Sequence, residues 1–136
     1  DLAAKVIDLS QPVLTAAGAV AKFVEKTEDV LLYADESQIS QILINLVKNA
    51  AQAGAKHIEI SAEIDKRDNV IINVSNDGPQ ISPASQEEIF IPFFTTKPDG
   101  SGIGLSLSRQ IMRMHGGTLR LTRSDSEATV FTLIFK

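Results

Sequence analysis

The 136-residue sequence predicts an α+β fold, in which helices and pairs of strands share one core. Apolar residues recur at helical spacing over residues 2–13 and again over 39–50. Strand pairs follow at 57–64 with 70–75 and at 118–122 with 129–135, each pair joined by a polar turn. A further helical pattern begins at a glycine cluster, residues 100–104.

Composition and charge limit the classes of function. The content of 43% hydrophobic and 22% charged residues is typical of a single folded domain. A net charge of -4 argues against a general nucleic-acid surface. The sequence has no cysteine, which excludes disulfides and thiolate metal sites, and it shows no signal peptide and no apolar run long enough to span a bilayer. Because the chain begins in helix-like sequence, we interpret it as a domain of a longer protein.

The first third of the chain predicts a helix followed by two short strands. Leu2, Val6, Leu9 and Val13 form the apolar face of the helix, Pro12 is expected to kink or break it, and Gly18 is expected to end it. The two strands are expected at residues 19–25 and 30–34, around a polar turn.

The second helix carries two stripes. Asp35 is expected to cap it, with Gln38 completing a capping-box-like pair. The apolar stripe should face the core and contains Ile39, Ile42, Leu43, Leu46, Val47 and Ala50. The other stripe consists only of amides, namely Gln38, Gln41, Asn45, Asn49 and Gln52. A solvated face would mix lysine with glutamate, so the amide row predicts a polar, partly dry pocket.

The hairpin that follows directs one amide inward. Alternation places Val70, Ile72 and Val74 on the core face, and by the same parity Asn76. A buried amide without a hydrogen bond costs about 1–3 kcal/mol, so Asn76 is expected to contact a ligand, with Asp77 as the second contact. The alternative is that Asn76 only forms the turn before Asp77 and Gly78.

A long loop and a glycine cluster come next. Residues 82–101 are expected to form a lid, docked by Phe90, Phe93 and Phe94. The cluster at residues 100–104 opens a helix, so its backbone N–H groups predict an anion cradle. Four residues mark the apolar face expected for this helix: Ile103, Leu107, Ile111 and Met114.

Four segments, in this order and spacing, resemble the sequence boxes of sensor histidine kinases. Residues 45–50 resemble the N box, 76–79 the first glycine box, 90–97 the F box and 100–105 the second glycine box. The resemblance covers nearly the whole chain. It implies a catalytic and ATP-binding domain over 1–136 with the GHKL fold, a two-layer sandwich in which helices cover one face of a mixed, mostly antiparallel sheet. It also implies an ATP lid and a dimerisation and phosphoacceptor domain that is absent from this chain.

The resemblance implies a role for each matching residue. Asn49 is the expected Mg²⁺ ligand, Asn45 supports the phosphates, and Lys97 is a cation for the β- or γ-phosphate, unless it is a plain exposed lysine. The remaining nucleotide contacts are expected at Gln52, Asn76, Asp77, Gly78, Gly100, Ser101, Gly102, Ile103, Gly104, Leu105 and Thr129. For Thr129 a structural hydroxyl is favoured over an adenine contact.

Three positions depart from the family pattern. Asn76 replaces the aspartate that accepts from the adenine amino group, Gln80 replaces the second glycine of its box, and Gln52 stands where a cation is often found. Since an uncharged acceptor forms the weaker hydrogen bond, we expect modest affinity for ATP.

The resemblance implies that this domain presents the γ-phosphate of Mg-ATP to a histidine on the dimerisation domain, with a response regulator downstream. It implies a cytoplasmic domain without nucleic-acid or membrane contacts, in a parent protein that can be membrane-anchored. Neither His57 nor His115 lies in a phosphoacceptor-like sequence. One alternative, a GHKL ATPase, needs a glutamate base where Asn45 stands. The other is a degenerate nucleotide- or partner-binding module, which Asn76 and Gln80 keep open.

Overall fold

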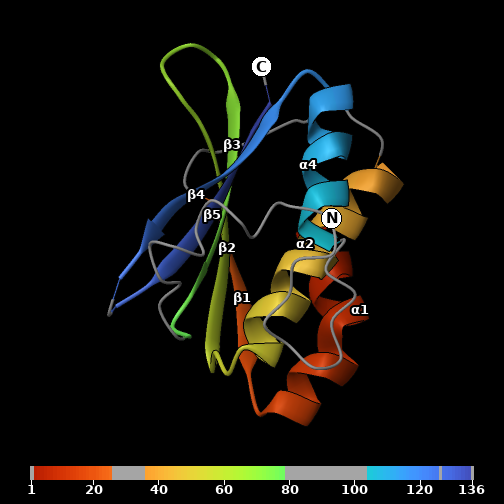
Figure 1. Cartoon of the computed structure of the whole chain (residues 1–136), viewed down its shortest axis with the longest axis vertical. Coiled ribbons are helices and arrows are strands. Elements are labelled where there is room, and N and C mark those ends of the chain that lie inside the picture. The colour runs from red at the N-terminus through yellow and green to blue at the C-terminus, as the bar shows by residue number, and fades with distance from the viewer. Residues whose placement is uncertain (1, 26–35, 79–103, 126, 136) are drawn as a thin grey trace.

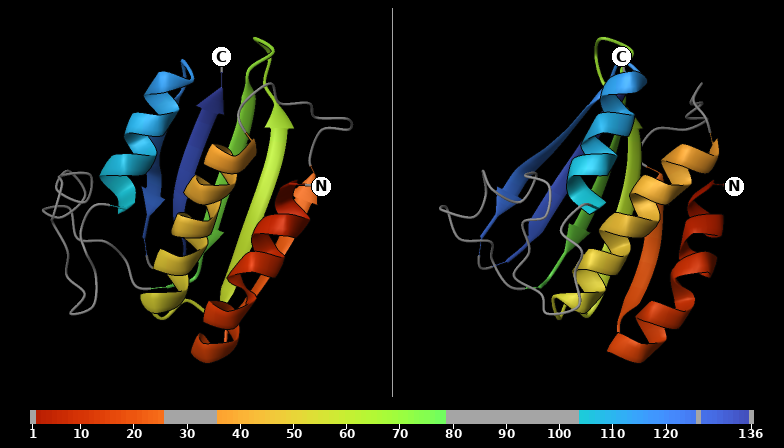
Figure 2. Two further views of the ribbon diagram at one scale, coloured as in Figure 1. Left: turned by 90° about the vertical axis from the view of Figure 1, so that its right-hand side faces the viewer. Right: turned by 45° about the vertical axis from the view of Figure 1, so that its right-hand side comes forward.

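The computed structural model describes residues 2–25, 36–78, 104–125 and 127–135. These residues form α1 (Leu2–Ala17), β1 (Val20–Glu25), α2 (Glu36–Gln52), β2 (His57–Ile64), β3 (Val70–Asn76), α4 (Gly104–Met114), β4 (Thr118–Ser124) and β5 (Thr129–Phe135). The helices form one layer and the sheet the other (Figure 1). Helix α2 lies between α1 and α4 on the same face of the sheet (Figure 2). In the described part of the chain, no helix combines the length and the apolar character needed to cross a membrane.

The sheet is mixed and mostly antiparallel, with strand order β1-β2-β3-β5-β4. Only the β1–β2 pair is parallel, while β2–β3, β3–β5 and β4–β5 are antiparallel. The chain returns to β2 through α2, because a parallel neighbour needs a crossover connection. The expected two-layer α+β fold is therefore confirmed.

The core lies where the sequence predicts it. All six residues of the apolar stripe on α2 are buried, and they belong to one cluster with the inward residues of β2, β3 and β5. Ile44, which lies near the amide row, is partly buried and packs against the same cluster. Burying these aliphatic side chains contributes about 1.5–3 kcal/mol each, so α2 is anchored mainly by this face.

Helix α4 is rotated relative to the prediction. Leu107 and Met114 were expected in the core but are 44% and 71% exposed. Ile111 is buried as predicted, and the other buried positions are Ser108 and Met112. The helix contacts both α2 and β4, so its buried arc faces the groove between them. A period of 3.6 fits either arc, and a serine within the buried arc conceals the correct one.

The N-terminal elements agree with the prediction in part. Helix α1 continues through Pro12, so of the kink or break expected there the break is wrong, and the helix ends at Ala17, directly before Gly18 with its φ of 66°. Pro12 is exposed, which lets its ring project into solvent. Strand β1 is confirmed. The strand expected at residues 30–34 and the cap at Asp35 lie outside the described residues.

Candidate nucleotide site

The inward amide lies at the C-terminal end of β3, in the middle of the sheet. Asn76 is only 8% exposed, and it pairs with Ile58 of β2 on one side and with Thr129 of β5 on the other. Its Oδ1 accepts a hydrogen bond of 2.9 Å from the backbone N–H of Gly78. The predicted inward direction is confirmed, and the turn that stood as its alternative is present as well.

Gly78 leaves no space for a side chain beside this amide. A Cβ at position 78 would lie 2.9 Å from Asn76 Oδ1 and 3.3 Å from the Cβ of Ala55. Asn76 and Gly78 therefore form one tight turn around the amide oxygen, because a larger residue would push that oxygen away.

The neighbouring Thr129 is 3% exposed, and its hydroxyl lies 3.0 Å from Ser124 Oγ. This contact joins the last residue of β4 to the first residue of β5, beside the turn of the hairpin. Thr129 thus has a structural partner, as the favoured interpretation of its hydroxyl expects. It also pairs with Asn76 across the β3–β5 ladder.

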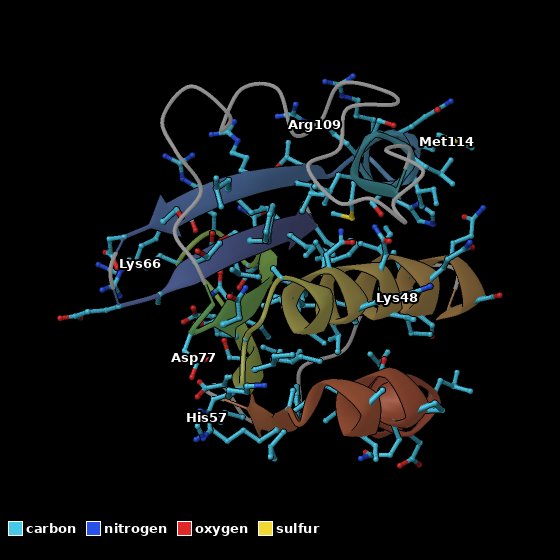
Figure 3. The ribbon with its side chains drawn as sticks, turned by 60° about the horizontal axis from the view of Figure 1, so that its bottom comes forward. Lys48, His57, Lys66, Asp77, Arg109 and Met114 are labelled. Carbon is cyan, nitrogen blue, oxygen red and sulfur yellow. The ribbon has the colours of Figure 1, made fainter. Side chains whose placement is uncertain are left out.

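Asp77 points away from the core and is bound by its own chain. Its Oδ1 accepts from the backbone N–H groups of Lys56 at 2.7 Å and His57 at 2.9 Å, and its Oδ2 lies 2.8 Å from His57 Nδ1. Figure 3 shows the two side chains together at the ends of β2 and β3. The backbone N–H of His57, followed by its imidazole and the N–H of Lys56, lowers the pKa of Asp77 to about 2.

The amide row of α2 faces α4 at one point. Asn45 is partly buried, and its Nδ2 donates to Ser108 Oγ at 3.4 Å. Asn49 lies one helical turn further along α2 and is also partly buried, whereas Gln41 is exposed. The row is therefore partly dry at its centre and solvated at Gln41.

Sequence reasoning missed Ser108. It is 4% exposed, and it accepts from a residue of the predicted site. The available signal was a small hydroxyl side chain three residues before Ile111, one helical turn earlier on the buried side of α4.

Helix α2, which carries the amide row, contacts both α4 and β3. Gly104 is the first residue of α4, and Leu105 is partly buried against the core. Gln52 is the last residue of α2. Lys97, Gly100, Ser101, Gly102 and Ile103 lie outside the described residues, as does the lid expected at residues 82–101. Their roles stay predictions.

The donors present fit magnesium better than a transition metal. In the ranges that the structure describes, no three His, Cys, Asp or Glu residues group into a metal site. Asn49 offers a hard amide oxygen, and Mg²⁺ commonly binds through one or two protein oxygens together with phosphate oxygens and water. The amide row is therefore compatible with a metal that arrives with its nucleotide.

Comparison with known proteins gives a consistent result. Residues 34–136 match the family described as histidine kinase-, DNA gyrase B-, and HSP90-like ATPase. The nucleotide-free catalytic domain of histidine kinase ThkA aligns with a TM-score of 0.85 at 36% identity, over 98% of this chain and 89% of that chain. Sensor histidine kinase ZraS of Salmonella typhimurium is 38% identical over 104 residues, which are 75% of this chain and 22% of ZraS. AtoS of Escherichia coli is 36% identical over 105 residues, 74% of this chain and 17% of AtoS. The chain thus spans about a fifth of these curated relatives.

Proposed function

This chain belongs to the family of histidine kinase-, DNA gyrase B- and HSP90-like ATPases, as a catalytic domain of the histidine kinase type, and from this premise we propose its detailed activity. It binds Mg-ATP between α2, α4 and the end of β3. It presents the γ-phosphate to a histidine on a separate dimerisation domain of its parent protein. The phosphoryl group then passes to a response regulator. We place this activity in the cytoplasm, where ATP is available.

One observation carries the proposal: the contact of Asn45 with Ser108 sets α2 beside the helix that begins at Gly104. This contact brings Asn45 of the amide row to within one helical turn of Gly104, the first residue of α4. A helix N-terminus offers unpaired N–H donors and a positive dipole end, both of which favour phosphate. Asn76 lies at the end of β3 and supplies a polar group for the base.

The residues of this chain act by positioning. Asn49 would hold Mg²⁺ through its amide oxygen, and Asn45 would orient the phosphates from one turn away. Bound Mg²⁺ supplies neutralisation of phosphate charge. Phosphoryl transfer of this kind depends mainly on alignment and charge neutralisation, so a domain without the acceptor histidine can still hold the nucleotide ready.

Both histidines of the chain have structural partners. His57 Nδ1 contacts Asp77, and His115 Nδ1 lies 2.8 Å from the carbonyl oxygen of Ile111. These contacts support the proposal that the acceptor histidine belongs to another domain, and that this fragment alone does not label itself.

The second candidate function is a nucleotide- or partner-binding module without phosphotransfer. The neutral Asn76 and the replacement at Gln80 favour it, since both weaken the expected base contacts. An ATPase of the gyrase type is disfavoured, because Asn45 cannot act as a general base.

Titration calorimetry with a non-hydrolysable ATP analogue and Mg²⁺ tests the proposal. We expect binding by the wild type and a strong loss in Asn49→Ala. Gln41→Ala is the matched control, since it removes an exposed amide from the same row and should bind normally. Absence of heat in the wild type would contradict nucleotide binding. Addition of a dimerisation domain that carries the histidine, with γ-labelled ATP, then separates the kinase from the binding-only module.

A further inference from the structure

We propose that Asp77, clamped by Lys56 and His57, is a positioning residue that holds the Asn76 amide in the one orientation that selects adenine over guanine. The proposal rests on the proposed function, since it concerns the base end of the same site. It gives Asp77 a different task from the direct ligand contact that its position in the sequence suggests.

Both carboxylate oxygens of Asp77 already have partners. Oδ1 accepts two backbone N–H groups, and Oδ2 meets the imidazole of His57. The backbone N–H of Asp77 in turn donates to the carbonyl oxygen of His57 at 3.3 Å. These contacts join the residue after β3 to the residues at the start of β2, so the chain beyond Asn76 is fastened to the neighbouring strand.

Asp77 makes these contacts directly beside Asn76, the residue expected to bind the base. Asn76 is the last residue of β3, and its partner Ile58 directly follows His57. The final pair of a strand ladder frays unless something ties it down. On its other side Asn76 pairs with Thr129, whose hydroxyl contacts Ser124. Asn76 is thus restrained from both neighbouring strands.

The Asn76 amide has a defined orientation. The N–H of Gly78 donates to Asn76 Oδ1, which distinguishes the oxygen from the nitrogen of the side chain. An amide presents one acceptor and one donor side by side, and this pair matches the edge of adenine. A flipped amide would instead match the Watson–Crick edge of guanine, where O6 is an acceptor in place of the adenine amino group and N1–H is a donor in place of the adenine N1 acceptor. The clamp fixes the backbone between Asn76 and Gly78, and so it fixes which base the amide accepts.

The chain supplies a matched control at the opposite end of the same two strands. Asp65 follows β2, and its Oδ1 accepts from the backbone N–H groups of Arg67 at 2.8 Å and Asn69 at 2.9 Å. Its Oδ2 accepts from Asn69 Nδ2 at 3.2 Å. Asp65 and Asp77 therefore stabilise opposite ends of the β2–β3 hairpin through similar hydrogen bonds, and of the two only Asp77 is next to Asn76 in the chain.

The experiment measures displacement of a fluorescent ATP analogue by non-hydrolysable analogues of ATP and GTP, with Mg²⁺ present. In Asp77→Ala we expect ATP affinity to fall about three- to tenfold, the equivalent of loosening one buried hydrogen bond, with a smaller change for GTP. The ATP-to-GTP preference therefore falls. Asp65→Ala should lower thermal stability while the preference stays at the wild-type value. Asp77→Asn keeps an acceptor oxygen for the two N–H groups and should restore part of the preference.

The outcomes separate cleanly. An unchanged ATP-to-GTP preference in Asp77→Ala, or an equal loss of this preference in Asp65→Ala, would overturn the inference. Asp77 would then only stabilise the hairpin. If Asp77→Ala does not fold, His57→Ala removes one of the three bonds to the carboxylate, and it should shift the preference in the same direction by less. A wild type that binds neither analogue would refute the proposed function instead, so the two failures are distinguishable.

Discussion

Two adjacent glycines after α4 offer a sharp test of the packing, because they are required for different reasons. Gly117 is buried, and a Cβ there would overlap the carbonyl oxygen of Ile134 in β5 and lie 3.0 Å from the Cε of Met112. Gly117 is also held by its N–H, which donates to the carbonyl of Met112 at 2.9 Å. Gly116 has open space around it, and it needs glycine for its φ of 71°.

The magnitudes follow from this difference. Overpacking costs about 1–3 kcal/mol, and Gly117→Ala should reach the upper end because its neighbour is backbone that cannot rotate aside. Ile134 pairs with Thr118, so a shift of its carbonyl disturbs the β4–β5 ladder. Gly116→Ala meets only the cost of a left-handed conformation, about 1–2 kcal/mol.

Urea unfolding followed by far-UV circular dichroism measures both variants. We expect Gly117→Ala to lose at least about 1 kcal/mol more of the free energy of unfolding than Gly116→Ala does. For a domain of this size, that difference corresponds to a Tm lower by about a further 3–4 °C. Gly116→Asn should lose less than Gly116→Ala, because asparagine tolerates the left-handed region. Equal losses at the two glycines, or a larger loss at Gly116, would refute the steric argument.

Three further predictions concern buried polar groups and the site. The hydroxyls of Ser10 and Ser40 are buried without a hydrogen-bond partner in the described part of the chain. Ser10→Ala and Ser40→Ala should therefore each raise the free energy of unfolding in urea by about 1 kcal/mol, and a lower free energy of unfolding in both variants would contradict this. The folded pKa of Asp77 is depressed from 3.8 to about 2, so the contribution of its carboxylate to folding stability is complete above pH 3.8 and is lost as pH falls toward 2. Asp77→Asn should therefore flatten the decline of Tm over this pH range, and an unchanged slope would count against the contacts of Asp77 with Lys56 and His57. Ser108→Ala should weaken Mg-ATP binding by calorimetry about fivefold, the equivalent of about 1 kcal/mol, because Asn45 loses its contact; unaltered affinity would show that Asn45 needs no support.

Where one face of an element is wholly apolar, the sequence was sufficient to predict the packing. The stripe of α2 and the alternation of β3 have a period that matches their burial, so both were predicted correctly. The same parity correctly turned Asn76 inward.

Helix α4 shows why such patterns can fail. The arc through Leu107 and Met114 and the arc through Ser108 and Met112 have the same period, and only the neighbours of the helix select between them. Those neighbours, α2 and β4, lie before and after it in the chain, and their positions follow from the sheet order. Local periodicity therefore located the helix without fixing its rotation.

The partners of Asp77 were also beyond local pattern reading. Strand parity shows that the side chain of Asp77 points outward. It does not show that the carboxylate accepts from two backbone N–H groups that lie 20 and 21 residues earlier in the chain. Their approach depends on the register in which Ile58 meets Asn76, which the whole hairpin sets. A residue that resembles a ligand contact in sequence can thus also have hydrogen-bond partners in the neighbouring strand.

The order of the two polar residues follows from the same geometry. Position 76 is nearly closed to water, and in the described structure its side-chain oxygen receives one backbone N–H. An aspartate there would place a carboxylate at a position nearly closed to water, one residue from the ionised Asp77, and both burial and a neighbouring like charge raise the cost of ionising it. A neutral amide inside and a charge outside avoid that repulsion, because Asp77 finds its donors in Lys56 and His57. At position 77 the carboxylate fastens the turn after β3 to the backbone at the start of β2.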